Sequence, residues 1–331
     1  MSLIITDNQH YSDIASAIRT KLSTNETFLP AQMASAIMSI SGGGGITPSG
    51  TYSVSSNGTF DITNYASVDV DVHPAHEDYI LKYTSANALT SFTDLSSTAI
   101  VYGAFAYTSS LATVSFPECT TIGNYAFAYC YKLRNISFPK LKTINTYAFQ
   151  YCSSLNFAIN STIFPSLSGT LGGYAFRGCQ YLTGVDHSGI TSLGVQTFSA
   201  CSRITTVNLP NVTSIGAGAF SYLTTCSQYS LPKLTYVASN AFTSNWKLTT
   251  ITLPVVTTIS AYAFRYCSSL MSLYLTGSTV PTLNASAFLN MPFSVSVNNV
   301  YGSIYVPSSL YATYVAATNW KTYSNRIVSI T

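Results

Sequence analysis

The sequence predicts a solenoid in which short parallel β-strands alternate with turns or short helices. The main observation is a phenylalanine that recurs nine times, at intervals of 22, 22, 27, 22, 22, 22, 22 and 24 residues. A period in the twenties is typical of repeats that bury their apolar faces only against their neighbours. The nine rings, which we expect to form the structural core, are Phe105, Phe127, Phe149, Phe176, Phe198, Phe220, Phe242, Phe264 and Phe288.

Two further columns of apolar residues align with these phenylalanines. The first lies five residues before each ring and consists of Ile100, Ile122, Ile144, Leu171, Leu193, Ile215, Val237, Ile259 and Leu283. The second is a Leu-x-x-Leu-x-Leu run, such as Leu248 to Leu253, that stands just before a proline in most repeats. We expect each run to form one strand that stacks in parallel on the next repeat. The proline ends the strand because it has no amide hydrogen to donate.

The residues before the repeats predict smaller modules. Apolar residues spaced for one helical face predict a helix over 9–22 and a second helix that begins at Pro30. Two short helices are not stable alone, so we expect them to dock on another protein or on a second copy of the chain. Gly42–Gly45 predicts a flexible linker. Alternating apolar residues around Asn57-Gly58 predict short strands with a tight turn.

The pattern of Leu248–Pro254 followed by Ile259–Cys267 resembles the BspA-like, treponemal-type leucine-rich repeat family, over about residues 98–290. The stretch from Ile304 to Trp320 resembles the closing strand and capping helix common after such arrays. Short N-terminal motifs, from Tyr11 to Phe60, look like modules of tailed-phage structural proteins. The family resemblance implies adhesion and ligand binding rather than catalysis. Secreted members carry a signal peptide and a wall anchor, and the absence of both patterns here weakens the bacterial-adhesin interpretation.

These patterns divide the chain into five parts. They are a helical docking module (1–41), a glycine linker (42–45), a short β module with a lead-in segment (46–97), the leucine-rich repeat array (98–290), and a C-terminal capping strand and helix (291–331). The predicted fold class is therefore a leucine-rich-repeat solenoid of nine repeats with small N-terminal helical and β modules and a C-terminal cap.

Catalytic and metal chemistry find little support in the sequence. All seven cysteines align with core columns, so we expect buried thiols, because a free cysteine packs as a small apolar residue. No Cys-x-x-Cys pair is present, and Pro74 keeps His73 and His76 off one helical face, so we expect no metal. Glu118 and Asp186 lie three repeats apart, too far for glycoside hydrolysis by paired carboxylates. We therefore expect no enzyme activity and no cofactor.

Tyrosines stand at two fixed positions beside the phenylalanines. Those two residues before a ring are Tyr125, Tyr147, Tyr174 and Tyr262, and those two residues after are Tyr107, Tyr129, Tyr151, Tyr222 and Tyr266. We expect two stripes along one flank, which either pack between repeats or bind sugars or proteins. The second candidate surface is the outward face of the strands, with Asn135, Asn208, Gln228 and Tyr274 among its hydrogen-bonding side chains. Ligand binding and plain hydration remain equal alternatives for that face.

Charge is unevenly distributed along the chain. Residues 1–99 carry three basic and nine acidic side chains, whereas residues 100–290 carry nine basic and two acidic ones. A basic array favours a polyanionic partner, although its charge density is too low for nucleic-acid binding. No apolar run is long enough to cross a membrane, so neither nucleic acid nor membrane is an expected partner.

Together these features predict a virion structural protein of a tailed phage, associated with the tail tip or a fibre and assembled in the host cytoplasm. Residues 1–72 would contact other virion proteins, and the chain would form a homo-oligomer. The array would bind a glycan, a teichoic acid or a protein on the host surface. One alternative is a BspA-like adhesin on a bacterial cell surface. Another is a capsid or tail decoration protein without receptor binding.

Overall fold

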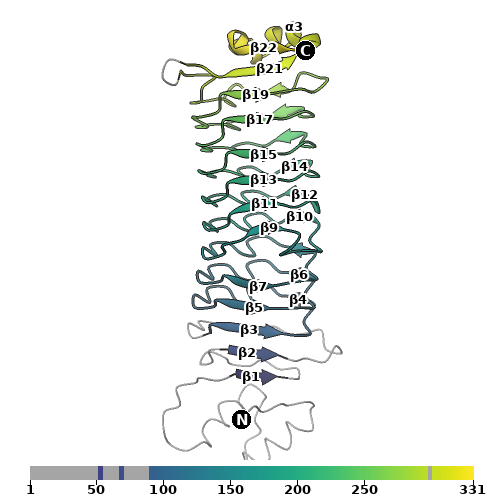
Figure 1. Cartoon of the computed structure of the whole chain (residues 1–331), viewed down its shortest axis with the longest axis vertical. Coiled ribbons are helices and arrows are strands. Elements are labelled where there is room, and N and C mark those ends of the chain that lie inside the picture. Colours follow the sequence, from purple (N-terminus) through teal and green to yellow (C-terminus); the bar gives the residue numbers. More distant parts are fainter. Residues whose placement is uncertain (1–50, 55–66, 71–88, 297–299) are drawn as a thin grey trace, which may run out of the picture.

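The protein is an elongated stack of coils in the computed structural model, which describes residues 51–54, 67–70, 89–296 and 300–331 (Figure 1). Successive coils follow one axis from β1 to β22, and the described C-terminal end lies at one end of the stack. The predicted solenoid is confirmed. Several sequence predictions fall outside the described residues, namely the helices over 9–22 and from Pro30, the linker Gly42–Gly45, the turn at Asn57-Gly58, and the pair His73 and His76.

One face of the solenoid is a ladder of parallel strands that pair in the sheets β1-β2-β3-β5-β7, β9-β11-β13-β15 and β17-β19-β21-β22. The bounds are β1 Thr51–Val54, β2 Ser67–Val70, β3 Ser91–Asp94, β5 Thr113–Ser115, β7 Asn135–Ser137, β9 Ala158–Asn160, β11 Gly184–Asp186, β13 Thr206–Asn208, β15 Gln228–Ser230, β17 Thr250–Thr252, β19 Ser272–Tyr274, β21 Ser303–Pro307 and β22 Ile327–Ile330. Equivalent positions of neighbouring repeats face each other, as Val185 faces Val207. The Leu-x-x-Leu-x-Leu runs thus form the predicted strands. The ladder also extends beyond the nine phenylalanine repeats, with β1 and β2 before them and β21 and β22 after them.

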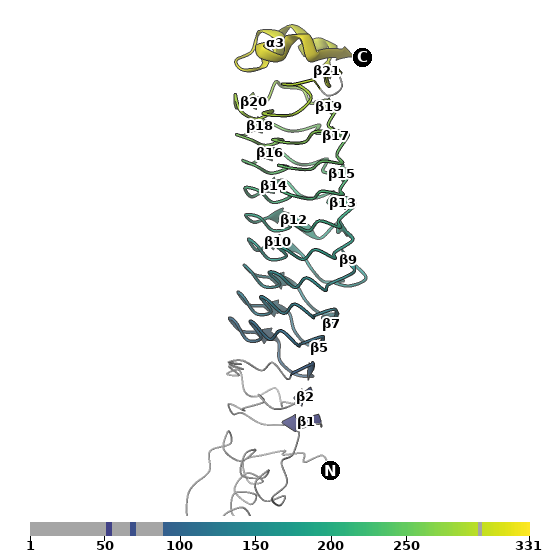
Figure 2. The ribbon, with the colours of Figure 1, turned by 90° about the vertical axis from the view of Figure 1, so that its left-hand side faces the viewer.

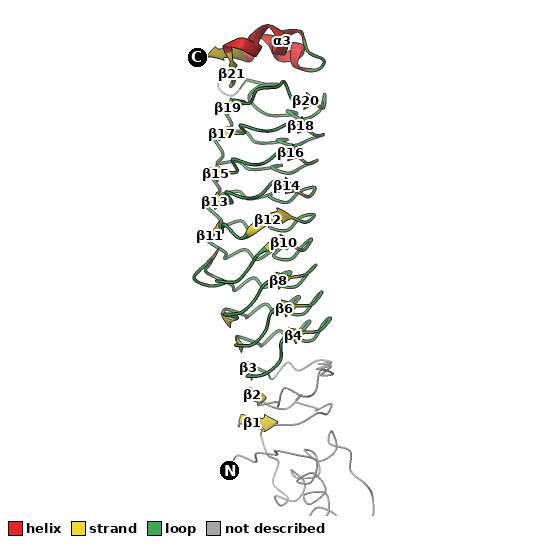
Figure 3. Cartoon of the chain, turned by 90° about the vertical axis from the view of Figure 1, so that its right-hand side faces the viewer, coloured by secondary structure: helices red, strands yellow, loops and turns green. Residues whose placement is uncertain are grey.

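A second parallel ladder runs along another side of the solenoid (Figure 3). Its strands are β4 Ala99–Ile100, β6 Thr121–Ile122, β8 Thr143–Ile144, β10 Gly169–Leu171, β12 Ile190–Leu193, β14 Ser214–Ile215, β16 Tyr236–Val237, β18 Thr258–Ile259 and β20 Thr282–Leu283. These strands contain the aliphatic residues that lie five positions before each phenylalanine. The sequence placed those residues in the core but did not predict the ladder, because strands of two to four residues are too short to show an alternation.

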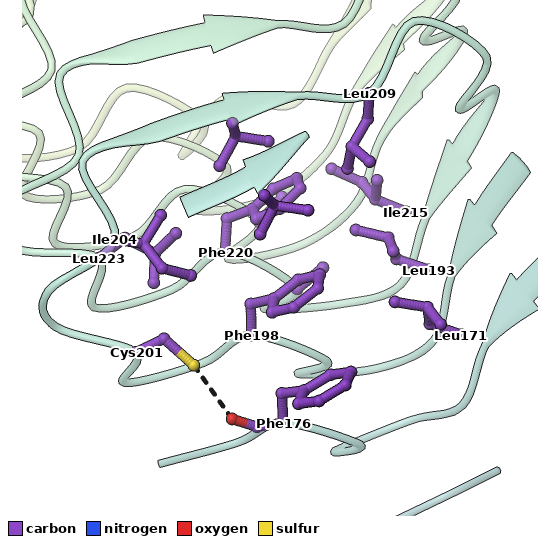
Figure 4. Packing of buried hydrophobic residues seen from close by; sticks show 14 of the residues in the cluster. Leu171, Phe176, Leu193, Phe198, Cys201, Ile204, Leu209, Ile215, Phe220 and Leu223 are labelled. Carbon is purple, nitrogen blue, oxygen red and sulfur yellow. Dashed lines mark hydrogen bonds between the residues drawn. The ribbon is translucent and has the colours of Figure 1, made fainter. Parts of the chain in front are cut away.

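The phenylalanine rings form one continuous file inside the stack. All nine are fully buried, and each ring centroid lies 5.1 to 6.1 Å from the next. Figure 4 shows Phe176, Phe198 and Phe220 pointing the same way, toward the aliphatic side chains of the second ladder. Every ring thus packs on the equivalent ring above and below it, which is the nearest-neighbour packing of a solenoid.

The turn that contains each phenylalanine carries a third hydrogen-bond ladder. The amide of the ring residue and the amides two residues to either side donate to carbonyls of the following repeat. In one repeat these bonds are Tyr125 to Thr146 at 3.1 Å, Phe127 to Ala148 at 2.8 Å and Tyr129 to Gln150 at 2.7 Å. The amides between them bond to carbonyls within the same turn. One set of alternate residues therefore joins the turn to the next repeat, and the other set holds the turn itself together.

The cysteines confirm the prediction of buried thiols, since all seven are free and buried. The five that lie three residues after a phenylalanine each donate to the carbonyl of the phenylalanine in the preceding repeat. Cys201 donates to Phe176 in this way at 3.0 Å (Figure 4). Burial raises the pKa of the Cys267 thiol to about 12. These thiols therefore serve the packing and hydrogen bonding of the core.

The 27-residue interval between Phe149 and Phe176 interrupts both strand ladders. β7 is not joined to β9 in one sheet, and β8 is not joined to β10 in one sheet. The longer repeat turns after β9, where the Asn160 carboxamide oxygen accepts the amides of Thr162 and Ile163, both at 3.0 Å. The turn is tied to the next repeat because the buried His187 ring bonds to the Phe164 carbonyl at 2.9 Å.

A short helical cap covers the C-terminal end of the stack (Figure 2). It contains the 3-10 helices η1 (Ser308–Leu310) and η2 (Trp320–Arg326) and the α-helix α3 (Tyr311–Ala316), between β21 and β22. The Trp320 indole donates to the Pro281 carbonyl at 2.7 Å and its ring lies against Phe288 and Tyr314. The last phenylalanine is thereby shielded. None of the helices among the described residues has the length and apolar content needed to cross a bilayer.

Candidate functional site

Two columns of residues flank the file of phenylalanines. The leading column, two residues before each ring, is Gly103, Tyr125, Tyr147, Tyr174, Gln196, Gly218, Asn240, Tyr262 and Ser286. The trailing column, two residues after each ring, is Tyr107, Tyr129, Tyr151, Gly178, Ala200, Tyr222, Ser244, Tyr266 and Asn290. Every member except Ser286 has a left-handed backbone, with φ between 50° and 73°.

Tyrosine is not the residue that this backbone favours. The left-handed region costs an L-residue roughly 1–2 kcal/mol, and glycine and asparagine enter it most readily. A compensating interaction is therefore required where tyrosine occupies the columns. In the N-terminal half of the array, ring contacts between neighbouring repeats supply it.

In the N-terminal half of the array the tyrosines of each column stack on one another. Tyr125, Tyr147 and Tyr174 have ring centroids 4.4 and 4.6 Å apart, and Tyr107, Tyr129 and Tyr151 have centroids 4.7 and 5.2 Å apart. Each such contact contributes about 0.5–1.5 kcal/mol, comparable to the backbone strain. Desolvation within the stacks raises the pKa of Tyr125 and Tyr129. These tyrosines therefore pack between repeats while their edges stay partly exposed.

Two arginines stand between the columns, each one residue after a phenylalanine. The Arg177 guanidinium lies 5.9 Å from the Tyr151 centroid and 5.7 Å from the Tyr174 centroid. Arg265 lies 5.3 and 4.6 Å from the centroids of Tyr262 and Tyr266 and donates to the Tyr266 hydroxyl at 2.9 Å. At both places a guanidinium lies close to one tyrosine ring of each column, and its positive charge is attracted to the aromatic rings.

The columns lose their tyrosines in the middle of the array. The leading column has Gln196, Gly218 and Asn240 in three successive repeats, and the trailing column has Gly178 and Ala200 before Tyr222. The result is a surface hollow of about 430 Å³, with Tyr151 and Arg177 among its lining residues together with Tyr222. This volume lies within the roughly 300–1,000 Å³ range of small-molecule sites.

The floor of this hollow is polar. Ser199, Ser221 and Thr243, each one residue after a phenylalanine, are buried there. The Ser221 hydroxyl is 2.9 Å from that of Ser199, and the Thr243 hydroxyl donates to the Tyr262 carbonyl at 3.0 Å. A ligand in the hollow would meet hydroxyls below and aromatic rings at the sides.

A glycine fixes one end of the hollow. A Cβ at Gly178 would stand 2.3 Å from the Tyr151 ring, so the ring can occupy its present place only above a glycine. The backbone of Gly178, with φ of 73°, independently favours glycine. Tyr151 therefore leans over the position where the trailing column would otherwise carry its next side chain.

The outward face of the main ladder differs from this flank. Asn135, Asn208 and Gln228 are exposed, and the Asn208 amide donates to the Asp186 carboxylate at 2.8 Å. Tyr274 is half-buried because it stacks on Tyr305, with 4.4 Å between the ring centroids. No cavity described above lies on these residues. The strand face is a flat row of hydrogen-bonding groups.

Metal-ligating and acidic side chains of the described residues have structural surroundings. No three histidine, cysteine or acidic side chains among them gather closely enough to hold a metal ion. Glu118 pairs with Lys140 at 2.6 Å, and Asp186 accepts from Asn208, so both carboxylates of the array have structural partners. Burial raises the pKa of the Cys119 thiol to about 11, which disfavours a nucleophilic thiolate there.

Sequence reasoning found the tyrosine columns but missed the hollow between them. Of the candidate tyrosines, Tyr151 and Tyr222 line it, whereas Tyr125, Tyr129, Tyr147 and Tyr174 stack outside its lining and Tyr262 and Tyr266 flank Arg265. The missed lining residues include Arg177, Gln196 and Asn240. Their signal was present in the same alignment, as the three repeats in which the leading column changes from tyrosine to smaller or more polar residues.

The family described as BspA type leucine rich repeat region matches the chain in six copies, over residues 77–160, 98–225, 156–271 and 191–304. No curated protein sequence matches the chain.

Solved leucine-rich repeat proteins from bacteria are similar to the chain. One from Bacteroides ovatus is 20% identical, with 64% of this chain and 59% of that chain covered and a TM-score of 0.48. The chain thus spans about three fifths of that relative's length. A leucine rich cell surface protein from Faecalibacterium prausnitzii is 18% identical, with 85% and 91% covered and a TM-score of 0.36. The leucine rich repeat protein of T. pallidum is 26% identical, with 46% and 86% covered and a TM-score of 0.34.

Proposed function

The chain belongs to the BspA type leucine-rich repeat family, and we propose that it is a non-catalytic binding protein whose tyrosine flank engages a polymer on a cell surface. The observation that carries the proposal is the conjunction of two tyrosine columns with a hydroxyl-lined hollow between them. Aromatic faces beside hydrogen-bonding groups suit sugars and other polyhydroxylated ligands, since both kinds of contact are available at once.

Charge supports a polyanionic polymer as the ligand. Residues 100–290 carry nine basic and two acidic side chains, so the array has a positive field that attracts negative polymers. A wall teichoic acid combines phosphate charge with hydroxyl groups and matches both features. The flank runs along the stack, which favours an extended chain over a single small molecule.

We propose the virion of a tailed phage as the carrier of this array. The support is the resemblance of the motifs between Tyr11 and Phe60 to modules of tailed-phage structural proteins, and residues 1–72 would then attach the array to other virion proteins or to sister chains. A bacterial cell surface is the alternative carrier. Detection of the chain at fixed copy number in purified virions would favour the first, and its recovery from cell envelopes of uninfected bacteria would favour the second.

The binding proposal is tested with the full chain and purified Gram-positive walls, either intact or stripped of teichoic acid. We expect retention on intact walls at low salt that declines steadily as ionic strength rises, because an exposed ionic contact is screened. Stripped walls should retain little. The absence of retention on intact walls at low salt would overturn the proposal.

Paired variants locate the binding surface. Tyr125→Asn with Tyr129→Asn removes flank rings while keeping residues that tolerate a left-handed backbone, and should weaken retention about tenfold. Asn208→Ala with Gln228→Ala removes strand-face groups and should leave retention unchanged. The reverse pattern would move the proposed surface to the strand face.

The stacking of the tyrosines also supports a second candidate, a decoration protein without receptor binding, because ring packing between repeats is sufficient reason for the columns. Removal of the array from the particle distinguishes the two. Normal adsorption of such particles would favour decoration.

A further inference from the structure

The hollow in the middle of the tyrosine flank has the composition of a sugar-binding subsite. We propose that it binds one pyranose unit bearing a negatively charged substituent, a carboxylate or a phosphate. The proposal rests on the binding function proposed above and assigns one subsite and one ligand class within it.

The hollow exists because side chains change while the backbone does not. Ala200 has φ of 60° and Gly218 has φ of 64°, within the range of the tyrosines in the same two columns. Tyrosines at these two positions would continue the stacks and fill the space. The opening of about 430 Å³ is therefore made by residue choice on an otherwise regular surface.

Tyr222 supplies a free aromatic face. Its side chain is 51% exposed, and its ring stacks on no other aromatic ring among the described residues. Its column neighbours are Ala200 and Ser244, which leave both ring faces without an aromatic partner. In the N-terminal half of the array these faces are covered by the next tyrosine. A pyranose ring presents an apolar face of C–H groups that would take the place of that missing ring.

Polar groups at the walls have unused hydrogen-bonding capacity. The Gln196 carboxamide makes no hydrogen bond with any described residue, and the Asn240 carboxamide uses only its oxygen, as an acceptor from Thr243 at 3.3 Å. The Ser221 hydroxyl lies 2.9 Å from both the Ser199 hydroxyl and the Gly218 carbonyl, and the buried Ser199 hydroxyl makes no other side-chain hydrogen bond with a described residue. Two amides and one hydroxyl can therefore donate to, or accept from, the hydroxyls of a sugar.

Arg177 is the reason to expect a preference for sugars with a negatively charged substituent. It lies above Tyr151 and Tyr174 at the end of the hollow and forms no ion pair with any carboxylate among the described residues. Arg265 occupies the equivalent position in a later repeat but donates to the Tyr266 hydroxyl. The Arg177 guanidinium thus retains its donors for an anionic substituent, which it can bind in bidentate fashion.

The experiment measures binding of three soluble probes to the full chain: glucuronic acid, glucose 6-phosphate and glucose. We expect both anionic sugars to bind more tightly than glucose, with saturation-transfer signals from the sugar C–H face. Preference for one of the two identifies carboxylate or phosphate as the recognised group. Equal binding of all three, or no binding, would overturn the proposal.

The decisive variant is Ala200→Tyr, which restores the column and closes the hollow. Tyrosine already occupies this turn position elsewhere and gains a stacking partner in Tyr222, so the variant should keep or raise the melting temperature. We expect it to lose sugar binding at least tenfold. Arg177→Gln should remove the preference for charged sugars only, and Tyr131→Asn, at an exposed tyrosine outside both columns, is the matched control that should bind as the parent does.

Wall retention separates this proposal from the broader one. If the parent chain binds the walls but none of the three sugars, the subsite is wrong and the binding function stands. If the parent binds the anionic sugars but not the walls, the subsite stands and the polymer proposal fails. A folded Ala200→Tyr variant that still binds the sugars like the parent would reject the assignment of the hollow.

Discussion

The tyrosine-rich part of the flank, from Tyr107 to Arg177, and the middle part, from Gln196 to Ser244, have the same backbone and different surfaces. Both have left-handed residues at the same two positions in each turn, with φ near 60°. Both have fully buried phenylalanines, 22 residues apart except for the 27-residue interval between Phe149 and Phe176. The comparison teaches that hydrogen bonds between turns, rather than side-chain preference, set this backbone. Side chains on the flank are consequently free to change, and the middle part is where they do.

The core changes less sharply than the surface. The position three residues after the phenylalanine is a thiol in the tyrosine-rich part, as in Cys152, and still at Cys201 in the middle part, whereas the next two repeats have Leu223 and Asn245 there. Asn245 keeps the hydrogen bond of the thiols by donating to the Phe220 carbonyl at 2.8 Å, and its oxygen accepts from the Tyr229 hydroxyl. The Phe220 carbonyl thus keeps a hydrogen bond from the equivalent position, with an amide as donor in place of a thiol. The Tyr229 hydroxyl satisfies the oxygen of the same amide.

Alkaline pH should destabilise the repeats that bury thiols and gives the largest expected effect. Burial raises the pKa of Cys119 and Cys226 to about 11 and that of Cys267 to about 12, and raises those of Cys152, Cys179 and Cys201 further. A raised folded-state pKa gives stability that is complete below the unfolded thiol value of ~8.5 and is lost as pH rises toward the folded value. Each such thiol removes about 1.4 kcal/mol per pH unit in that window.

Urea denaturation at pH 7, 8.5 and 10 measures this effect. The unfolding free energy should fall by about 0.4 kcal/mol per thiol between pH 7 and pH 8.5, where half of the unfolded thiols are ionised, and by about 2 kcal/mol per thiol between pH 7 and pH 10. Cys152→Ala should reduce the loss of unfolding free energy between pH 7 and pH 10 by the contribution of one thiol. A stability that stays constant up to pH 10 would contradict the buried thiol column.

Removal of one phenylalanine from each part tests whether their cores are equivalent. Phe149→Ala and Phe198→Ala should each lower the unfolding free energy by about 3–5 kcal/mol, because both rings are fully buried and leave a cavity. Phe149 lies 5.3 Å from both neighbouring rings, and Phe198 lies 5.5 and 6.1 Å from its neighbours. Denaturation of both variants checks this, with the exposed Leu289→Ala as control. If only one of the two variants lost stability, the cores of the two parts would not be equivalent.

The repeat period made the core residues predictable from the sequence, but it did not indicate the backbone conformation of the turns. The phenylalanines, the aliphatic residues such as Ile215 and the cysteines repeat at intervals set by one coil, so alignment alone places them inside. The left-handed turns could not be foreseen, because tyrosine at Tyr125 or Tyr129 is an unfavourable residue there and is retained by contacts between repeats. The second strand ladder was missed for a different reason, since segments such as Ser214–Ile215 are too short to show a pattern.

The hollow shows a further limit of sequence reasoning. Columns were identified by the residues they share, whereas the hollow is defined by residues that depart from a column, such as Gly218 and Asn240. Its depth also depends on Tyr151 leaning over Gly178, a contact between repeats that no single-repeat motif contains. Alignment can indicate where a column is broken, but only the packed structure shows whether neighbours close the gap.

The smallest expected effect distinguishes stacked from unstacked tyrosines and tests the comparison most directly. Tyr129 contacts Tyr107 and Tyr151 with centroids 4.7 and 5.2 Å away, so Tyr129→Asn should lower the unfolding free energy by about 1–2 kcal/mol. Tyr222 stacks on no aromatic ring among the described residues, so Tyr222→Asn should change it by less than about 0.5 kcal/mol. Asparagine suits the left-handed backbone at both sites, so the difference isolates ring stacking. Equal losses would mean that the columns are held by the backbone alone, and a larger loss at Tyr222 would reverse the roles assigned to the two parts.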